Sequence, residues 1–362
     1  MLKTTENKIN EIYNKRIQKV KEQLNILGAD AFITNNRLNF YYLSNFSGST
    51  GILVITNDEN YLIVDGRYTL RAKNEAINTN IIEANDKTKL SSSLIKLLKE
   101  LNITKLAVEA HNLTLSNYLI YKEHFKIIPT YFLVENIRAI KEENEIQLIK
   151  KAMEITEIVL KETEELLKNN ISRVKESEVS FYIKQRINDL GGGLAFEPIV
   201  AFGSNTAFPH YTPKDTILKE NDFVIIDMGA TYLGYHSDIT RSFCFGNNPK
   251  FKELYNIVLE AQLESIKSIR VGLPAKEAFN KAVEIFKKYQ LENYFTHGLG
   301  HGVGLEIHEL PSLSFASNNY LNVGNIITIE PGIYVENIGG IRIEDLILIT
   351  ENSIELISSY PK

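Results

Sequence analysis

The sequence predicts a chain of two domains, the first of the α/β class and the second built around β-strands that end in carboxylates. Three observations carry this prediction. At 362 residues the chain exceeds the usual size of one domain. Short β-rich runs alternate with helical patterns over the first 130 residues, as in α/β domains. Further along, several β-rich runs carry Asp or Glu where a purely structural strand would be apolar.

The composition is that of an ordinary soluble globular protein, with 44% hydrophobic and 23% charged residues. A net charge of -5 and a pI near 5.9 give no basic surface for nucleic acid, so peptide or small-molecule partners are expected. The single cysteine, Cys244, excludes an internal disulfide and a zinc–thiolate cluster. The first residues lack the apolar core of a signal peptide, and no apolar run reaches the length of a membrane span. The sequence therefore predicts a cytoplasmic protein that binds neither nucleic acid nor membrane.

The first domain is expected to span residues 1–130. Apolar residues recur at helical spacing from Ile9 to Leu24, and Gly28 follows as a helix stop. β-rich runs predict strands at 31–34, 51–56, 61–64 and 105–109. Helical patterns are expected at 68–75 and 90–101.

The second domain is expected to span residues 131–362 and to include a linking helix. The stretch 134–170 has no proline or glycine and is rich in Glu, Lys, Ile and Leu, which predicts one long helix or a pair. Further helices are expected at 177–190, 251–269 and 275–289. The last two would cover one face of a sheet formed by the strands around them.

The stretch 222–245 predicts a β-hairpin with a turn near Tyr232 and Leu233. Asp227 ends the first strand and Asp238 begins the second, so the two carboxylates are expected to lie opposite each other. Like charges in that position destabilise a strand pair, so either a proton or a cation is expected between them. The alternative is that one aspartate caps the turn while the other is solvated.

A second carboxylate pair is expected further along. Glu330 ends the β-rich run 326–329, and Glu344 lies in the run 340–349, with a turn at residues 337–340 between them. The midpoint of the two glutamates is residue 337, so they are expected to face each other across antiparallel strands.

Three histidines stand in a glycine-rich stretch between these pairs, His297-Gly-Leu-Gly-His301-Gly-Val-Gly-Leu-Glu-Ile-His308. His297 and His301 have the spacing of a helical zinc pair, but the glycines argue against a helix. We expect a loop that passes into a strand, where glycine lets the backbone approach a ligand or metal. Four carboxylates and one histidine then predict a site for two divalent ions. Such ligands favour Mn²⁺, Co²⁺ or Fe²⁺, with Zn²⁺ as an alternative.

The sequence resembles the pita-bread metallopeptidases, above all aminopeptidase P, with prolidase and methionine aminopeptidase as relatives. The resemblance covers nearly the whole chain and rests on five motifs: Asp227, Ser237-Asp238-Ile-Thr-Arg241, the stretch from His297 to His308, Glu330-Pro-Gly-Ile-Tyr334, and Gly340-Ile-Arg-Ile-Glu344-Asp345. It implies an α/β N-terminal domain followed by an α+β pita-bread catalytic domain, and a homodimer. It also implies the metal ligands, which are Asp227, Asp238, His301, Glu330 and Glu344.

The same resemblance implies a reaction. A hydroxide that bridges two divalent metals, with Mn²⁺ favoured, would attack the scissile carbonyl of a peptide with proline in second position. His210, His297, His308 and Glu330 are the expected catalytic residues, with Glu330 moving the proton. Tyr334 and Arg342 are candidates for substrate contact, although Tyr334 is also a core candidate and Arg342 a partner for a ligand carboxylate. The alternatives are an Xaa-Pro dipeptidase, a methionine aminopeptidase or a non-catalytic peptide-binding relative.

Overall fold

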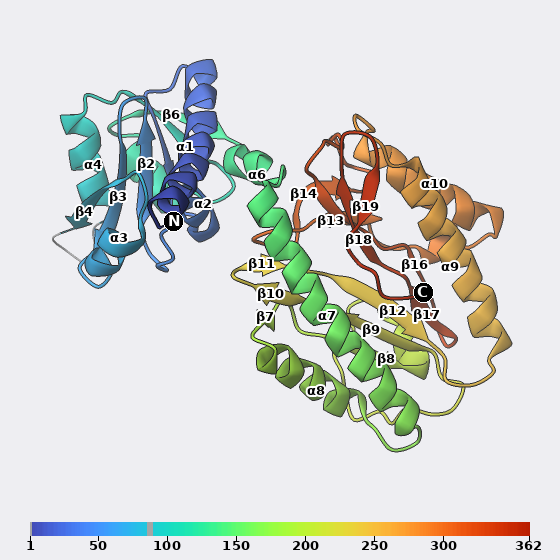
Figure 1. Cartoon of the computed structure of the whole chain (residues 1–362). Coiled ribbons are helices and arrows are strands. Elements are labelled where there is room, and N and C mark those ends of the chain that lie inside the picture. Colours follow the sequence, from blue (N-terminus) through green and yellow to red (C-terminus); the bar gives the residue numbers. More distant parts are fainter. Residues whose placement is uncertain (1, 85–89) are drawn as a thin grey trace. The chain divides into compact units, whose positions relative to one another are not determined.

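The computed structural model describes residues 2–84 and 90–362, and the chain divides into two compact units, Met1–Arg138 and Ala139–Lys362 (Figure 1). Each unit has its own hydrophobic core. No helix within the described ranges combines the length and the apolar character needed to cross a bilayer.

The first unit is built on a six-stranded mixed sheet in the order β4-β3-β2-β1-β5-β6. β2 runs antiparallel to β1 and β3, whereas the pairs β3–β4, β1–β5 and β5–β6 are parallel. β1 and β2 are buried along their whole length, which fits their continuous β-branched and aromatic sequences. The strands are β1 (Ala31–Thr34), β2 (Ile52–Thr56), β3 (Asn60–Asp65), β4 (Asn80–Ala84), β5 (Lys105–Glu109) and β6 (Lys126–Thr130).

The helices of this unit confirm the α/β prediction. They are α1 (Leu2–Leu27), α2 (Arg37–Ser44), α3 (Thr69–Glu75), α4 (Leu90–Glu100), α5 (Leu115–Tyr121) and α6 (Leu133–Arg138). Gly28, with φ of 61°, ends α1 as expected. The prediction missed α2, α5, β4 and β6, because elements this short carry little periodicity. α2 is instead set by its N-cap, where the Asn36 side chain accepts from the backbone N–H of Leu38.

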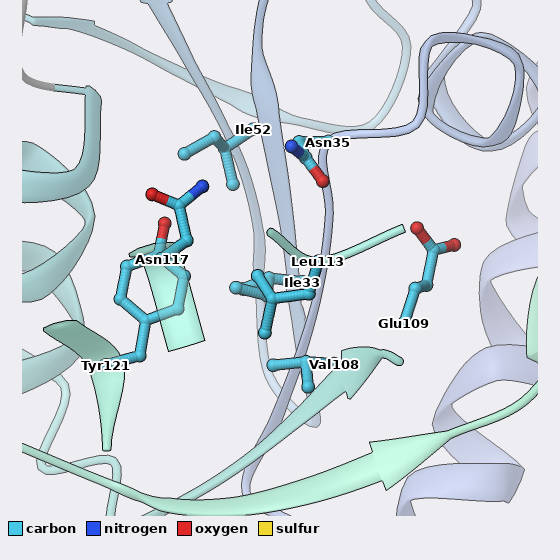
Figure 2. A pocket seen from close by; sticks show the side chains of 8 residues that line it. All are labelled: Ile33, Asn35, Ile52, Val108, Glu109, Leu113, Asn117 and Tyr121. Atoms are coloured by element: carbon cyan, nitrogen blue, oxygen red, sulfur yellow. The ribbon is translucent and has the colours of Figure 1, made fainter. Parts of the chain in front are cut away.

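A small hollow lies at the carboxyl ends of β1 and β5 (Figure 2). Its volume of about 10 Å³ is roughly what one water molecule needs, so it cannot hold a peptide. Glu109 lies at its edge and accepts hydrogen bonds from Thr34 and Asn39. Burial raises the pKa of this carboxyl to about 7. The lining residues are Ile33, Asn35, Ile52, Val108, Glu109, Leu113, Asn117 and Tyr121.

The second unit contains two helix pairs packed on strands (Figure 1). The predicted stretch 134–170 forms two helices, α6 in the first unit and α7 in the second. α7 (Glu143–Asn169) packs against α8 (Glu176–Asp189), and α7 contacts β9, which carries Asp227, whereas α8 contacts β7 and β8. α9 (Pro249–Ser268) and α10 (Ala275–Lys288) pack together over the later strands. Two short 3₁₀ helices are η1 (Gly203–Ala207) and η2 (Glu292–Tyr294).

The strands of the second unit form four small sheets, in the orders β11-β10-β7, β12-β9-β8, β14-β13-β15-β18-β19 and β16-β17. Their bounds are β7 (Gly193–Leu194), β8 (Ile199–Phe202), β9 (Val224–Met228), β10 (Ala230–Tyr232), β11 (Tyr235–His236), β12 (Ile239–Phe243), β13 (Gly300–Gly302), β14 (Glu309–Leu313), β15 (Ile326–Ile329), β16 (Gly332–Val335), β17 (Gly339–Arg342), β18 (Asp345–Ile349) and β19 (Ile354–Leu356).

The core of the second unit determines which way the later carboxylates point. Ala278, Ala282 and Phe286 recur every four residues on α10, so they form one buried stripe. Ile329 and Ile343 belong to the same core. Because successive side chains of an extended strand point to opposite faces, the neighbouring Glu330 and Glu344 point away from the helices.

Candidate metal centre

The hairpin that carries the two aspartates has a different register from the predicted one. Tyr232 pairs with Tyr235 around a two-residue turn, in which Leu233 and Gly234 have φ of 47° and 87°. Asp227 consequently pairs with Thr240, and the predicted direct opposition of Asp227 and Asp238 is wrong. The predicted turn was centred one residue too early, which shifts the partner by two. Asp238 is two residues from Thr240, so the two carboxylates are diagonal neighbours on one face.

The register of the later strands confirms that Glu330 and Glu344 face each other. Ile329 pairs with Asp345 at the end of β15, and Gly332 pairs with Arg342 at the start of β16. Both pairs belong to the same antiparallel register, which sets Glu330 opposite Glu344.

Three of the predicted ligands form a compact donor group. One ligand atom each from Asp238, His301 and Glu344 lies within 4.8 Å of the others. Nε2 of His301 is also 3.3 Å from Oε1 of Glu330. Among the predicted ligands, three carboxylate oxygens are buried without a hydrogen-bond partner in the described part of the chain, namely Oδ1 of Asp227, Oδ1 of Asp238 and Oε1 of Glu344. Buried oxygens without donors need a cation, so the residues present fit a divalent metal.

The ring of His301 is oriented as a metal ligand requires. Its Nδ1 lies 3.0 Å from the carbonyl oxygen of Gly302, and since a carbonyl only accepts, Nδ1 carries the hydrogen. Nε2 is then the ring atom that faces Asp238 and Glu330. A ring lone pair opposite carboxylates calls for a proton or a metal ion between them.

The electrostatics of the carboxylates support the same conclusion. Burial, followed by the charge of Glu344, raises the pKa of Asp238 well above its usual range. Burial, followed by the charge of Glu330, also raises the pKa of Glu344 well above its usual range. Burial raises the pKa of Asp227. Burial opposes ionisation of Glu330 too, but without metal a protonated His301 donates to it, and this bond and nearby positive charges lower the pKa of Glu330 to about 2. Without a cation, the group cannot hold all its negative charges.

Arg342 is the fixed positive charge of the site. Its side chain is 4% exposed, and its guanidinium donates to Asp227, to the hydroxyl of Tyr334 (2.7 Å) and to Oγ1 of Thr240 (3.0 Å). The structure thus shows Arg342 paired with a predicted ligand carboxylate, which is one of its two expected roles. Substrate contact by Arg342 stays a prediction.

Tyr334 connects Arg342 to His297. The hydroxyl of Tyr334 is 2.9 Å from Nε2 of His297, whose Nδ1 donates to the carbonyl of Gly298 (2.7 Å). Tyr334 is buried, and its pKa is raised to about 12, first by burial. Burial also lowers the pKa of His297. Both ring nitrogens of His297 are therefore occupied within the protein, so a bond from it to substrate would replace one of these contacts.

The rings of His308 and His210 are more open. Both residues are exposed, and the described residues provide no hydrogen bond to either ring. The centroid of His308 lies 4.3 Å from that of His301. Partial burial, followed by the charge of His301, lowers the pKa of His308. The charge of His210 is a minor cause of the lowered pKa of both His297 and His308, behind burial in each case.

Two of the glycines around His301 are required by the neighbouring strands. A Cβ on Gly300 would lie 2.0 Å from the carbonyl oxygen of Thr328 in β15. A Cβ on Gly302 would lie 2.2 Å from that of Leu310 in β14. These glycines let β13 fit between its two neighbouring strands, and their approach to a ligand stays a prediction.

Sequence reasoning missed Thr240 as a member of the site. Its hydroxyl donates to Oε2 of Glu344 (2.8 Å) and accepts from Nε of Arg342. A signal was available, because Thr240 lies two residues after Asp238 and therefore on the same face of the strand.

Comparisons with known proteins agree with this geometry. The model of metallopeptidase family M24 matches residues 147–351, and that of the creatinase/prolidase N-terminal domain matches residues 16–140. The chain is 36% identical to the Xaa-Pro dipeptidase of Pyrococcus horikoshii, over 94% of this chain and 96% of that protein.

Two solved structures are similar over nearly the full length. The Xaa-Pro dipeptidase from Bacillus anthracis has a TM-score of 0.92 at 36% identity, covering 97% of this chain and 98% of the other. The X-Pro aminopeptidase from Thermotoga maritima has a TM-score of 0.84 at 33% identity, covering 94% and 98%.

Proposed function

Because the chain belongs to metallopeptidase family M24, with a creatinase-type N-terminal α/β domain before its pita-bread catalytic domain, we propose that it is a dinuclear aminopeptidase for peptides with proline second. The observation that supports the metal chemistry is the set of buried carboxylate oxygens without donors around Nε2 of His301. The proline preference rests on what the similar proteins are named for.

In this proposal Asp227, Asp238, His301, Glu330 and Glu344 would hold two divalent ions, with Mn²⁺ as the favoured metal. When bound, such ions polarise the scissile carbonyl and make a water molecule acidic enough to react near neutral pH. The resemblance to aminopeptidase P also leads us to propose a homodimer.

The residues of the chain would supply binding and proton transfer. Glu330, whose carboxylate lies beside Nε2 of His301, would accept a proton and pass it to the leaving nitrogen. His308 has an open ring beside His301 and can donate to the carbonyl oxygen as it gains negative charge. Arg342 and Tyr334 would keep Asp227 and His297 in place through their hydrogen bonds.

His308→Ala is expected to retain metal and to lose turnover by roughly a hundredfold, the usual cost of one oxyanion contact. The measurement combines kcat/KM on an Xaa-Pro peptide with elemental analysis of the bound metal. His124→Ala, which changes an exposed histidine of the first unit, is the control and should behave like the wild type. Near-normal turnover of His308→Ala would show that this ring only packs against its neighbours.

A second candidate function is that of an Xaa-Pro dipeptidase, because two of the similar proteins carry that name. A dipeptidase needs a cation that captures the free carboxylate of a two-residue substrate. Arg342 is buried and its guanidinium is shared among Asp227, Tyr334 and Thr240, so that cation would have to be another residue.

The deciding assay compares Gly-Pro, Gly-Pro-Ala and a longer Xaa-Pro peptide in the presence of Mn²⁺. We expect release of the first residue from the two longer peptides, because an aminopeptidase leaves the leaving-group side of its site open, whereas a dipeptidase closes it around the free carboxylate of the dipeptide. Cleavage of the dipeptide alone would favour the dipeptidase. Efficient cleavage of Met-Ala-Ser without any proline substrate would favour a methionine aminopeptidase, and no cleavage despite full metal loading would favour a peptide-binding protein.

A further inference from the structure

Glu176, the first residue of α8, is a fully buried carboxylate outside the metal centre. Its Oε1 accepts from the backbone N–H of Phe202 and from Nδ2 of Asn205, both at 2.8 Å. Its Oε2 accepts from the hydroxyl of Tyr211 at 2.9 Å and from the backbone N–H of Lys214 at 3.1 Å. Four donors on one carboxylate offset the cost of burying its charge.

All four donors belong to a single segment, residues 202–214, which we call the His210 loop. The loop lies between β8 and β9 and carries the exposed His210 directly before the buried Tyr211. α8 binds the loop through its backbone as well, since the N–H of Ser177 donates to the carbonyl of Lys214 (2.9 Å). Glu176 is therefore the point at which the loop is fixed to the helix.

The other side of the His210 loop contacts the metal centre. The hydroxyl of Thr206 accepts from the N–H of Gly340 (2.8 Å), and the carbonyl of Pro209 accepts from Nη1 of Arg342 (3.3 Å). A Cβ on Gly340 would lie 2.1 Å from the carbonyl oxygen of Thr206, so the loop is packed tightly on β17. The position of the loop is thus set from one side by Arg342 and β17, and from the other by Glu176.

We propose that Glu176 is a positioning residue that fixes the His210 loop and so presents the ring of His210 to substrate at the metal centre. The proposal rests on the proposed function, because His210 is expected to act on substrate only if the chain is such a peptidase. Glu176 itself does not touch the metal ligands or the substrate. It acts through Tyr211, whose ring is buried and bonded while the adjacent ring of His210 is exposed.

Glu176→Gln is the sharpest variant, because it keeps the size of the side chain but removes its charge and replaces one of its two accepting oxygens by a donating NH₂ group. A carboxylate accepts at both oxygens, whereas the amide nitrogen of Gln is a donor and would face the N–H of Lys214 or the N–H of Phe202. Glu178→Gln, on an exposed residue of the same helix turn, is the matched control. Tyr211→Phe removes one donor and leaves Glu176 in place, which gives a milder test if Glu176→Gln folds poorly.

The first measurement does not depend on activity. Histidine labelled with ¹³C at Cε1 gives one NMR signal per ring, and the signal of His210 is the one missing from His210→Ala. In protein loaded with Zn²⁺, Glu176→Gln and Tyr211→Phe should move or broaden the signal of His210 and leave that of His124 unchanged. An unaltered His210 signal in both variants would overturn the proposal, whatever the substrate proves to be.

The second measurement is a double-mutant cycle on kcat/KM. Glu176→Gln should lower kcat/KM roughly 10- to 100-fold through the misplaced ring, with bound metal unchanged. In the His210→Ala background the same change should cost no more than about threefold, because coupled residues are not additive. If the double variant loses kcat/KM by the product of the two single-variant factors, Glu176 acts independently of His210. Absence of cleavage by the wild type would instead contradict the proposed function and leave the NMR result to decide on Glu176.

Discussion

Asp238→Asn is expected to change the stability of the protein in opposite directions with and without metal. In EDTA the variant should melt at a higher temperature than the wild type, because one of the closely spaced buried carboxylates is replaced by a neutral side chain. With Mn²⁺ it should melt at a lower temperature, because an anionic ligand is lost. Metal at a hundred times its Kd stabilises a folded protein by about 2.7 kcal/mol, and the variant should forfeit much of that.

The advantage of the metal-free variant should grow with pH. The pKa of Asp238 is raised in the folded protein, so folding takes up a proton once the pH exceeds the usual carboxyl pKa of about 4. The metal-free wild type therefore loses stability as the pH rises above about 4, whereas Asn at this position cannot titrate.

Melting curves from pH 5 to 8 in EDTA and in Mn²⁺, together with kcat/KM, test this expectation. Turnover should fall by on the order of 10³-fold, because metal polarisation is worth several kcal/mol and about 1.4 kcal/mol is tenfold. Asp215→Asn, which changes an exposed carboxylate in the same unit, is the control and should show no such reversal. A variant that melts below the wild type in both buffers would mean that Asp238 is a structural residue.

Arg342→Met is expected to destabilise the protein by about 3–5 kcal/mol, since it removes one partner of a buried ion pair and leaves Asp227 without a counter-charge. The hydroxyls of Tyr334 and Thr240 lose their donor in the same step. At roughly 2–4 °C per kcal/mol, the Tm should fall by about 10 °C. Arg342→Lys should recover only part of this loss, because an ammonium cannot reach three partners in the plane of a guanidinium.

Arg186→Met is the matched control. Arg186 pairs with Glu162 near the surface, where the two side chains are 29% and 31% exposed, and such pairs contribute about 0–1 kcal/mol. Urea unfolding of Arg342→Met, Arg342→Lys and Arg186→Met in EDTA distinguishes the loss of a buried ion pair from the loss of a surface pair. Equal stability of Arg342→Met and Arg186→Met would contradict the structural role assigned to Arg342.

Much of the candidate site could be predicted from the alternation of residues along the strands. The rest depended on the conformation of single turn residues, which the alternation does not show. Two β-rich runs with a turn midway between Glu330 and Glu344 were enough to predict that the two glutamates face each other. The turn of the aspartate hairpin was predicted one residue too early, because Leu233 adopts a positive φ that its residue type does not favour.

The role proposed for Glu176 was beyond sequence reasoning for another reason. Its hydrogen-bond partners lie 26 to 38 positions further along the chain, and they include two backbone N–H groups that have no sequence signature. For Arg342 the sequence predicted a ligand carboxylate as partner but not which one, and the partner that the structure shows, Asp227, lies 115 positions away. Contacts of this kind become visible only once the strands are placed.

The glycines of β13 have a consequence for recognising inactive relatives of this protein. Gly300 and Gly302 are required by the neighbouring strands, whereas His301 between them is a proposed metal ligand. Selection for the fold and selection for catalysis therefore act on alternate residues of one short strand. A descendant that gave up hydrolysis would be free to replace His301 or Asp238 while keeping both glycines. The two glycines thus indicate the fold of such a relative. The residue between them, at the position of His301, indicates whether it can still bind metal.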